Sequence, residues 1–95
     1  MAEPRRWAFV SSHGAVLIEV TRHPDATVRE IAERVGLTER QAHRVLGDLV
    51  GEHYVLRSRI GRRNSYRVHE DAPMRHAILA DRRIGDLLAL LAPKD

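Results

Sequence analysis

Hydrophobic residues recur at helical spacing through the first half of the chain. Between residues 13 and 22 the chain is apolar nearly all round, which is typical of a helix buried on most sides. Between residues 28 and 35, apolar side chains fall at i, i+3, i+4 and i+7, with charged residues between them. A third stripe of the same kind is formed by Ala42, Val45, Leu46 and Leu49. The pattern therefore predicts three helices.

Start and stop signals place the second and third of these helices close together. Thr27 is followed three residues later by Glu30, and Thr38 in the same way by Gln41, so each pair predicts a capping box at a helix N-terminus. Gly36 stands between the two boxes as the expected left-handed stop. Two short helices joined so tightly must cross at a steep angle. Residues 27–52 therefore predict a helix-turn-helix.

The spacing of the apolar residues along the chain changes after the third helix. "VLRSRI" and "SYRVH" are short β-prone segments joined by "GRRN", in which Gly61 and Asn64 supply the turn chemistry. Residues 54–69 therefore predict a β-hairpin with a basic tip. Near the N-terminus, the apolar stretch "WAFV" at residues 7–10 predicts either a short strand or an anchor.

Helical spacing returns in the last part of the chain, at about residues 74–92. One apolar stripe is formed by Ala77, Ala80, Ile84, Leu87, Leu88 and Leu91. This stripe either packs over the first helix of its own chain or pairs with the same stripe of a second copy in a dimer. We favour the dimer, because an exposed apolar stripe of this size is an aggregation liability in a monomer. The predicted interface consists of Trp7, Ile84, Leu87, Leu88 and Leu91, with Gly85 permitting a close approach where two such helices cross.

Composition sets the class of the protein. A chain of 95 residues with 43% hydrophobic residues predicts one globular domain, residues 1–95, with a mainly α fold, a small β-hairpin and the order α-α-α-β-β-α. The chain has no cysteine and no apolar run long enough for a signal peptide or a membrane span. We therefore expect a cytoplasmic, nucleoid-associated protein that makes no membrane contact.

Charge is distributed unevenly. The formal net charge is +3, yet five arginines and no acid lie between Tyr54 and Arg67, which leaves the remainder of the chain at −2. Local positive fields of this kind usually face phosphates. The third helix adds side chains suited to a major groove, because arginine pairs with guanine, glutamine with adenine, and threonine with a thymine methyl group or a phosphate. Its expected outer face carries Arg40, Gln41, Arg44 and Asp48, with Thr38 and Glu39 at its N-terminal end.

The stretches "TVREIAERVGLTERQAHRVLGDLV", "YVLRSRIGRRNSYRV" and "RRIGDLLALL" resemble the bacterial winged helix-turn-helix transcriptional regulators of the MarR/ArsR-like group. The resemblance covers roughly residues 13–91. It implies a homodimer that binds double-stranded DNA at an inverted-repeat operator. The implied contacts fall on Thr38, Arg40, Gln41, His43 and Arg44 in the recognition helix and on Arg62, Arg63 and Asn64 in the wing, and Arg59 completes the predicted DNA-binding set. Such proteins usually carry a glycine before the aromatic residue that follows the recognition helix. Here that position is His53, so either His53 takes the cap position or the helix ends at Gly51.

Other functions are less well supported. The cluster His69, Asp71 and His76 lacks the ligand spacing of a metal sensor, and we predict neither a metal nor a cofactor. His13 is better explained as a helix cap or a phosphate contact. Nothing in the sequence indicates an enzyme. The alternative function is a protein-interaction module whose wing arginines meet an acidic partner, and the sequence does not indicate whether a small-molecule effector exists.

Overall fold

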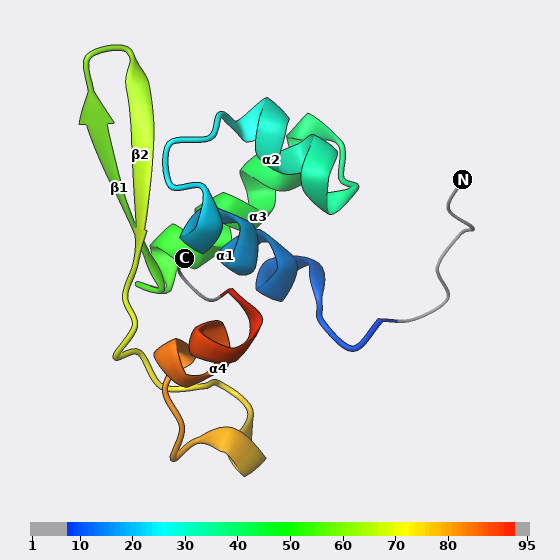
Figure 1. The fold of residues 1–95 in the computed structure, drawn as a ribbon, viewed down its shortest axis with the longest axis vertical. Coiled ribbons are helices and arrows are strands. Elements are labelled where there is room, and N and C mark those ends of the chain that lie inside the picture. Colours follow the sequence, from blue (N-terminus) through cyan, green and yellow to red (C-terminus); the bar gives the residue numbers. More distant parts are fainter. Residues whose placement is uncertain (1–7, 93–95) are drawn as a thin grey trace.

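Three helices, a hairpin and a final helix follow one another in the predicted order. The computed structural model describes residues 8–92. These residues form helices α1 (Ser12–Arg22), α2 (Val28–Val35) and α3 (Glu39–Gly51), strands β1 (Val55–Ile60) and β2 (Arg63–Val68), a 3-10 turn η1 (Ala77–Leu79) and helix α4 (Ile84–Leu91). Figure 1 shows the hairpin projecting beyond the helices, with α4 at the opposite end of the molecule. This is the architecture of a winged helix-turn-helix domain.

Both capping boxes are present, as the sequence predicted. The Thr27 hydroxyl oxygen accepts from the Glu30 amide at 3.1 Å, and the Glu30 carboxylate accepts from the Thr27 amide at 2.9 Å. The hydrogen bond from the Thr27 amide lowers the pKa of Glu30. Thr38 and Gln41 repeat both bonds at 3.1 and 2.9 Å. Gly36 ends α2 at φ 86°, a left-handed conformation that favours glycine. Local signals therefore fix both ends of the turn between α2 and α3.

The core is aliphatic and centres on α1. Its largest fully buried side chains are Val16, Val20, Ile31, Leu46 and Val55. Helix α1 contacts α2, α3, β2 and α4, and this explains why its sequence is apolar nearly all round.

The recognition helix ends in a left-handed residue that is not glycine. Helix α3 ends at Gly51, and His53 adopts φ 67°. The His53 amide donates to the Val50 carbonyl at 3.1 Å, and the Tyr54 amide donates to the Leu49 carbonyl at 2.9 Å. This pair of bonds is the Schellman arrangement. Both expected features therefore occur together: the helix ends at Gly51 and His53 takes the left-handed position.

The hairpin turn is tighter than predicted. Ile60 pairs with Arg63, so only Gly61 and Arg62 form the loop, and Gly61 has φ 62°. Glycine at the first loop position suits a two-residue hairpin turn. Asn64, which the sequence placed in the turn, lies inside β2 opposite Arg59. The base of the hairpin is fixed to the α1–α2 loop, because the Tyr66 amide donates to the Pro24 carbonyl at 3.1 Å.

The predicted C-terminal helix of residues 74–92 was too long. Pro73 and Arg83 form an isolated antiparallel bridge, and the Met74 amide donates to the Arg82 carbonyl at 2.9 Å. The residues between them therefore form a closed loop that contains only η1. Helix α4 begins at Ile84, where the Asp86 carboxylate accepts from the Arg83 amide at 3.0 Å. Ala77 and Ala80 are exposed and do not belong to the stripe of α4.

Burial corrects two residues of the predicted dimer interface. Ile84 is 7% exposed and Leu88 is 3% exposed, and both belong to their own chain's core, where α4 packs on α1. Neither side chain is therefore available to a partner. Leu87 is half-buried and Leu91 is 39% exposed. Trp7, the remaining residue of that prediction, lies outside the described residues, and residues 8–10 form no strand.

Gly85 has a different role from the one predicted. Its amide donates to the Glu70 carbonyl at 2.8 Å, and an added Cβ would lie 3.1 Å from that carbonyl oxygen. The close approach that this glycine permits is therefore made to the chain leaving the hairpin, not to a second α4.

Candidate nucleic-acid interface

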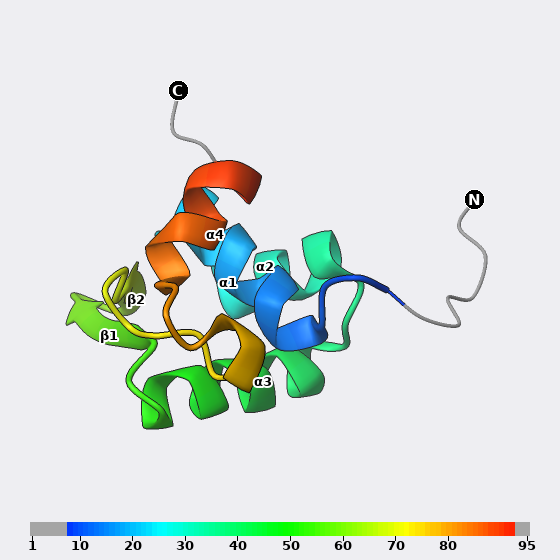
Figure 2. The ribbon, with the colours of Figure 1, turned by 90° about the horizontal axis from the view of Figure 1, so that it is seen from below.

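The outer face of α3 presents two arginines. Arg40 and Arg44 are exposed on the side opposite the buried stripe, one turn apart. Neither guanidinium has a hydrogen-bonded or ionic partner within the described part of the chain. Figure 2 shows α3 along one edge of the molecule, outside α1, with the hairpin following its C-terminal end. The helix therefore offers two unpaired cationic side chains on an open surface.

Thr38 and Gln41 are less available than the sequence suggested. The Thr38 hydroxyl oxygen and the Gln41 side-chain carbonyl oxygen are both engaged in the capping box. A bidentate contact with adenine needs the donor and the acceptor of one amide. The Gln41 acceptor is already used at the helix N-terminus. In this geometry the pair mainly fixes where α3 begins.

Two further polar residues of α3 are held within the domain. His43 lies 3.9 Å from the Glu39 carboxylate one turn earlier. Asp48 accepts a hydrogen bond from His13 Nε2 at 2.8 Å, which ties α3 to the start of α1. The N-cap of α1 is Ser11, whose hydroxyl oxygen accepts from the Gly14 amide at 3.1 Å. His13 is thus not the cap that the sequence suggested, and it links the two helices.

The wing arginines differ in how they are held. Arg62 occupies the two-residue turn, is exposed, and has no side-chain partner among residues 8–92. The Arg63 guanidinium donates to the Asp25 carbonyl at 2.8 Å, and Arg59 Nε donates to the Gly61 carbonyl at 3.4 Å. Arg59 and Asn64 face each other across the strands and share one face of the hairpin. Arg62 is therefore the arginine of the predicted wing set whose guanidinium has no partner among the described residues.

Two arginines outside α3 and the wing are neutralised by acids. Arg34 donates to Glu19 at 2.8 Å and Arg75 donates to Glu52 at 2.7 Å. These hydrogen bonds to carboxylates raise the pKa of each guanidinium. Neither pair lies on the outer face of α3 or in the wing. Arg40, Arg44 and the wing tip Arg62 have no carboxylate partner among residues 8–92, so their positive charges face solvent.

No group of three or more histidine, cysteine, aspartate or glutamate side chains comes together within residues 8–92 to hold a metal ion. His76 instead caps η1, accepting from the Ile78 amide at 3.4 Å. None of the helices in this range is long and apolar enough to cross a membrane.

Comparison with known proteins agrees with this geometry. Residues 12–55 match a family described as winged helix-turn-helix DNA-binding. The matched segment runs from the start of α1 through α3 to the first residue of β1, so it includes both capping boxes and the candidate recognition helix. No curated protein matches the chain. The match and the fold support a DNA-binding regulator rather than an enzyme.

Proposed function

We propose that this protein is a sequence-specific transcriptional regulator that places α3 in the major groove of double-stranded DNA. The observation that carries the proposal is the pair Arg40 and Arg44, which stand exposed and unpaired on α3 among the described residues. Arginine reads guanine through a bidentate contact in the major groove. A winged helix-turn-helix fold and the family match support this use of α3.

Base reading is concentrated in the first half of α3. Arg40 and Arg44 lie there, whereas Gly47 and Gly51 on the outer side of the second half have no side chain to reach a base. The N-terminus of α3 adds backbone amides that favour phosphate. His43 completes this face, while Thr38 and Gln41 support it through the cap.

The wing forms the second contact of the proposal. Arg62 at the tip reaches the phosphate backbone or the adjacent minor groove, whose negative potential attracts arginine. Arg59, Arg63 and Asn64 support that contact from the strands. An arginine-tipped wing beside a helix in the major groove holds the duplex at two points.

A homodimer is the assembly that we propose. With Ile84 and Leu88 buried, the large apolar side chains that α4 still exposes are Leu90 (79% exposed) and Leu91 (39% exposed), with half-buried Leu87 on the same helix. Two-fold pairing through this surface would place two recognition helices about 34 Å apart, or a multiple of that distance, on an inverted-repeat operator.

Selection of bound sequences from a random duplex library tests this function directly. We expect one motif to be enriched, with guanine at a position in each half-site, arranged as an inverted repeat. A protein-interaction module predicts a different result: no motif is enriched at any salt concentration, whereas an acidic peptide binds. That result would replace DNA recognition with the alternative function.

The wing contact predicts a change in salt dependence. Arg62→Ala should weaken binding to every duplex and lower the slope of log K against log salt by about one unit for each binding unit, because one phosphate contact is lost. Binding is measured by fluorescence anisotropy across a salt series. Arg82→Ala removes an exposed arginine of the 74–83 loop, outside the wing and α3, and should leave the slope unchanged. Equal slopes for wild type and Arg62→Ala would contradict the wing contact.

A further inference from the structure

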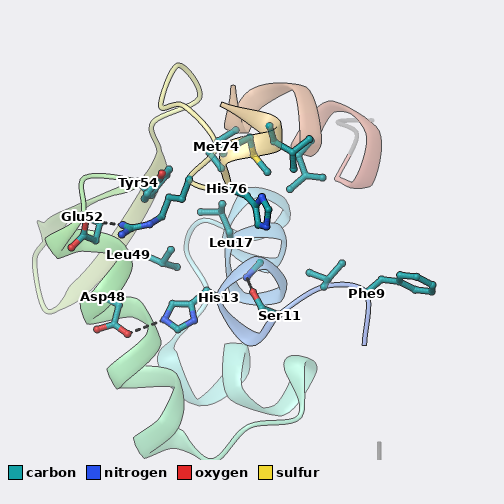
Figure 3. A pocket seen from close by; sticks show the side chains of 16 residues that line it. Phe9, Ser11, His13, Leu17, Asp48, Leu49, Glu52, Tyr54, Met74 and His76 are labelled. Carbon is teal, nitrogen blue, oxygen red and sulfur yellow. Dashed lines mark hydrogen bonds and ion pairs between the residues drawn. The ribbon is translucent and has the colours of Figure 1, made fainter. Parts of the chain in front are cut away.

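A groove of about 720 Å³ lies between the N-terminal end of α1, the C-terminal end of α3 and residues 74–87 (Figure 3). We call it the interhelical groove. Its apolar lining includes Leu17, Leu49, Met74, Leu79, Ile84 and Leu87. Small-molecule sites in proteins are commonly clefts of about 300–1,000 Å³ with an apolar lining and a few polar groups. The interhelical groove has this size and this composition within a single chain.

Two polar pairs stand at this groove. His13 Nε2 lies 2.8 Å from Asp48, and the Arg75 guanidinium lies 2.7 Å from Glu52 (Figure 3). Asp48 belongs to α3 and Glu52 is the residue that caps its C-terminus, whereas their partners come from α1 and from the 74–83 loop. With histidine counted as neutral, two carboxylates face one guanidinium, so the polar groups of the groove carry a net negative charge. Asp48 is the carboxylate that no arginine or lysine neutralises among the described residues.

We propose that the interhelical groove binds a small amphipathic organic amine. Its ammonium group takes the place of His13 beside Asp48, and its apolar body lies on the partly exposed lining side chains Met74, Leu79 and Leu87. Charge complementarity selects this class of ligand. An organic acid of the same shape would meet the carboxylates of Asp48 and Glu52, and the one guanidinium present is already paired with Glu52.

Such a ligand would act on the recognition helix directly. Asp48 and Leu49 belong to the same helix as Arg40 and Arg44, and displacement of His13 removes one hydrogen bond between α3 and α1. If this changes DNA affinity, DNA must change amine affinity by the same factor. That coupling rests on the proposed DNA-binding function. Amine binding does not, so the two are tested separately.

The test uses the full chain and three probes of one shape: phenylbutylamine, phenylbutanol and phenylbutyrate. Binding is followed by NMR through the methyl resonances of Leu17 and Leu49 at pH 8. We expect the amine to bind about fivefold more tightly than the alcohol, the upper range for a partly exposed ion pair, and the carboxylate to bind most weakly.

Three variants separate recognition of the charge from simple apolar binding. Asp48→Asn should bring the affinity for the amine down to that for the alcohol. His13→Ala removes the group that competes for Asp48 and should tighten amine binding. Glu33→Gln, an exposed carboxylate of α2 that does not line the groove, is the matched control and should change nothing. Circular dichroism verifies that each variant is folded.

The proposal is overturned if the three probes bind wild type equally, or if Asp48→Asn keeps the preference for the amine. It is also overturned if amine binding weakens as the protein concentration rises, because a second copy would then occupy the groove. If the wild type binds the amine but binds no DNA, only the proposed DNA-binding function is overturned. These outcomes therefore distinguish the two proposals.

Discussion

Leu88→Asp should remove a large part of the protein's free energy of unfolding. Leu88 is 3% exposed and lies in the core where α4 packs on α1. Removing a buried leucine side chain to alanine costs about 2–5 kcal/mol, and a buried carboxylate without a partner adds a further penalty. A domain of this size has a total stability of about 5–14 kcal/mol. Urea unfolding followed by circular dichroism measures the loss.

Leu90→Asp is the matched control for this prediction. Leu90 is on the same helix but is 79% exposed, so its replacement should change the free energy of unfolding by less than about 0.5 kcal/mol. If α4 forms the proposed dimer, Leu90→Asp should yield a folded monomer in sedimentation experiments. A Leu88→Asp protein that keeps wild-type stability and becomes monomeric would contradict the assignment of Leu88 to the core. It would place Leu88 in the dimer interface instead.

The second large effect is expected on the outer face of α3. Replacement of both Arg40 and Arg44 by alanine should weaken binding to the selected duplex by about 2–6 kcal/mol, the sum of two contacts of about 1–3 kcal/mol each. The loss on random duplex should be much smaller, because only the charge and not the reading of bases is lost there. Competition binding at one fixed salt concentration compares the two duplexes.

Gln41→Ala tests a finer point on the same helix. Because the Gln41 side chain closes the capping box, its loss should destabilise the start of α3 while base preference is kept. Circular dichroism and the duplex competition separate these effects.

A contrary outcome is possible for the two arginines. If the Arg40 and Arg44 replacements weaken both duplexes equally, α3 does not read sequence, and the arginines serve only as phosphate contacts.

The first half of the fold could be predicted from the sequence because its signals are local. Each capping box joins residues three positions apart, and Gly36 ends α2 through its own backbone conformation. The stripe of α3 leaves Arg40 and Arg44 on the outside by helical geometry alone. The hairpin followed in the same way from a change of period and a glycine turn, although Asn64 was misplaced because pairing begins at Arg63.

Contacts between distant residues could not be predicted in this way. His13 and Asp48 are 35 positions apart, and neither has a neighbour that signals the other. Because Pro73 and Arg83 form a bridge, the last helix is shorter than predicted. The close approach of the Glu70 backbone explains why residue 85 is a glycine. The interhelical groove likewise joins side chains from α1, α3 and α4.

The last helix shows most clearly which features the sequence determines and which depend on the tertiary structure. Its sequence determined that Ile84, Leu87, Leu88 and Leu91 would share an apolar side, since a period of 3.6 residues is a property of the chain alone. Whether that side meets a second copy or its own first helix depends on where α1 lies after folding. The tertiary structure decided this for Ile84 and Leu88, because burying them against α1 removes their apolar surface from water within one chain.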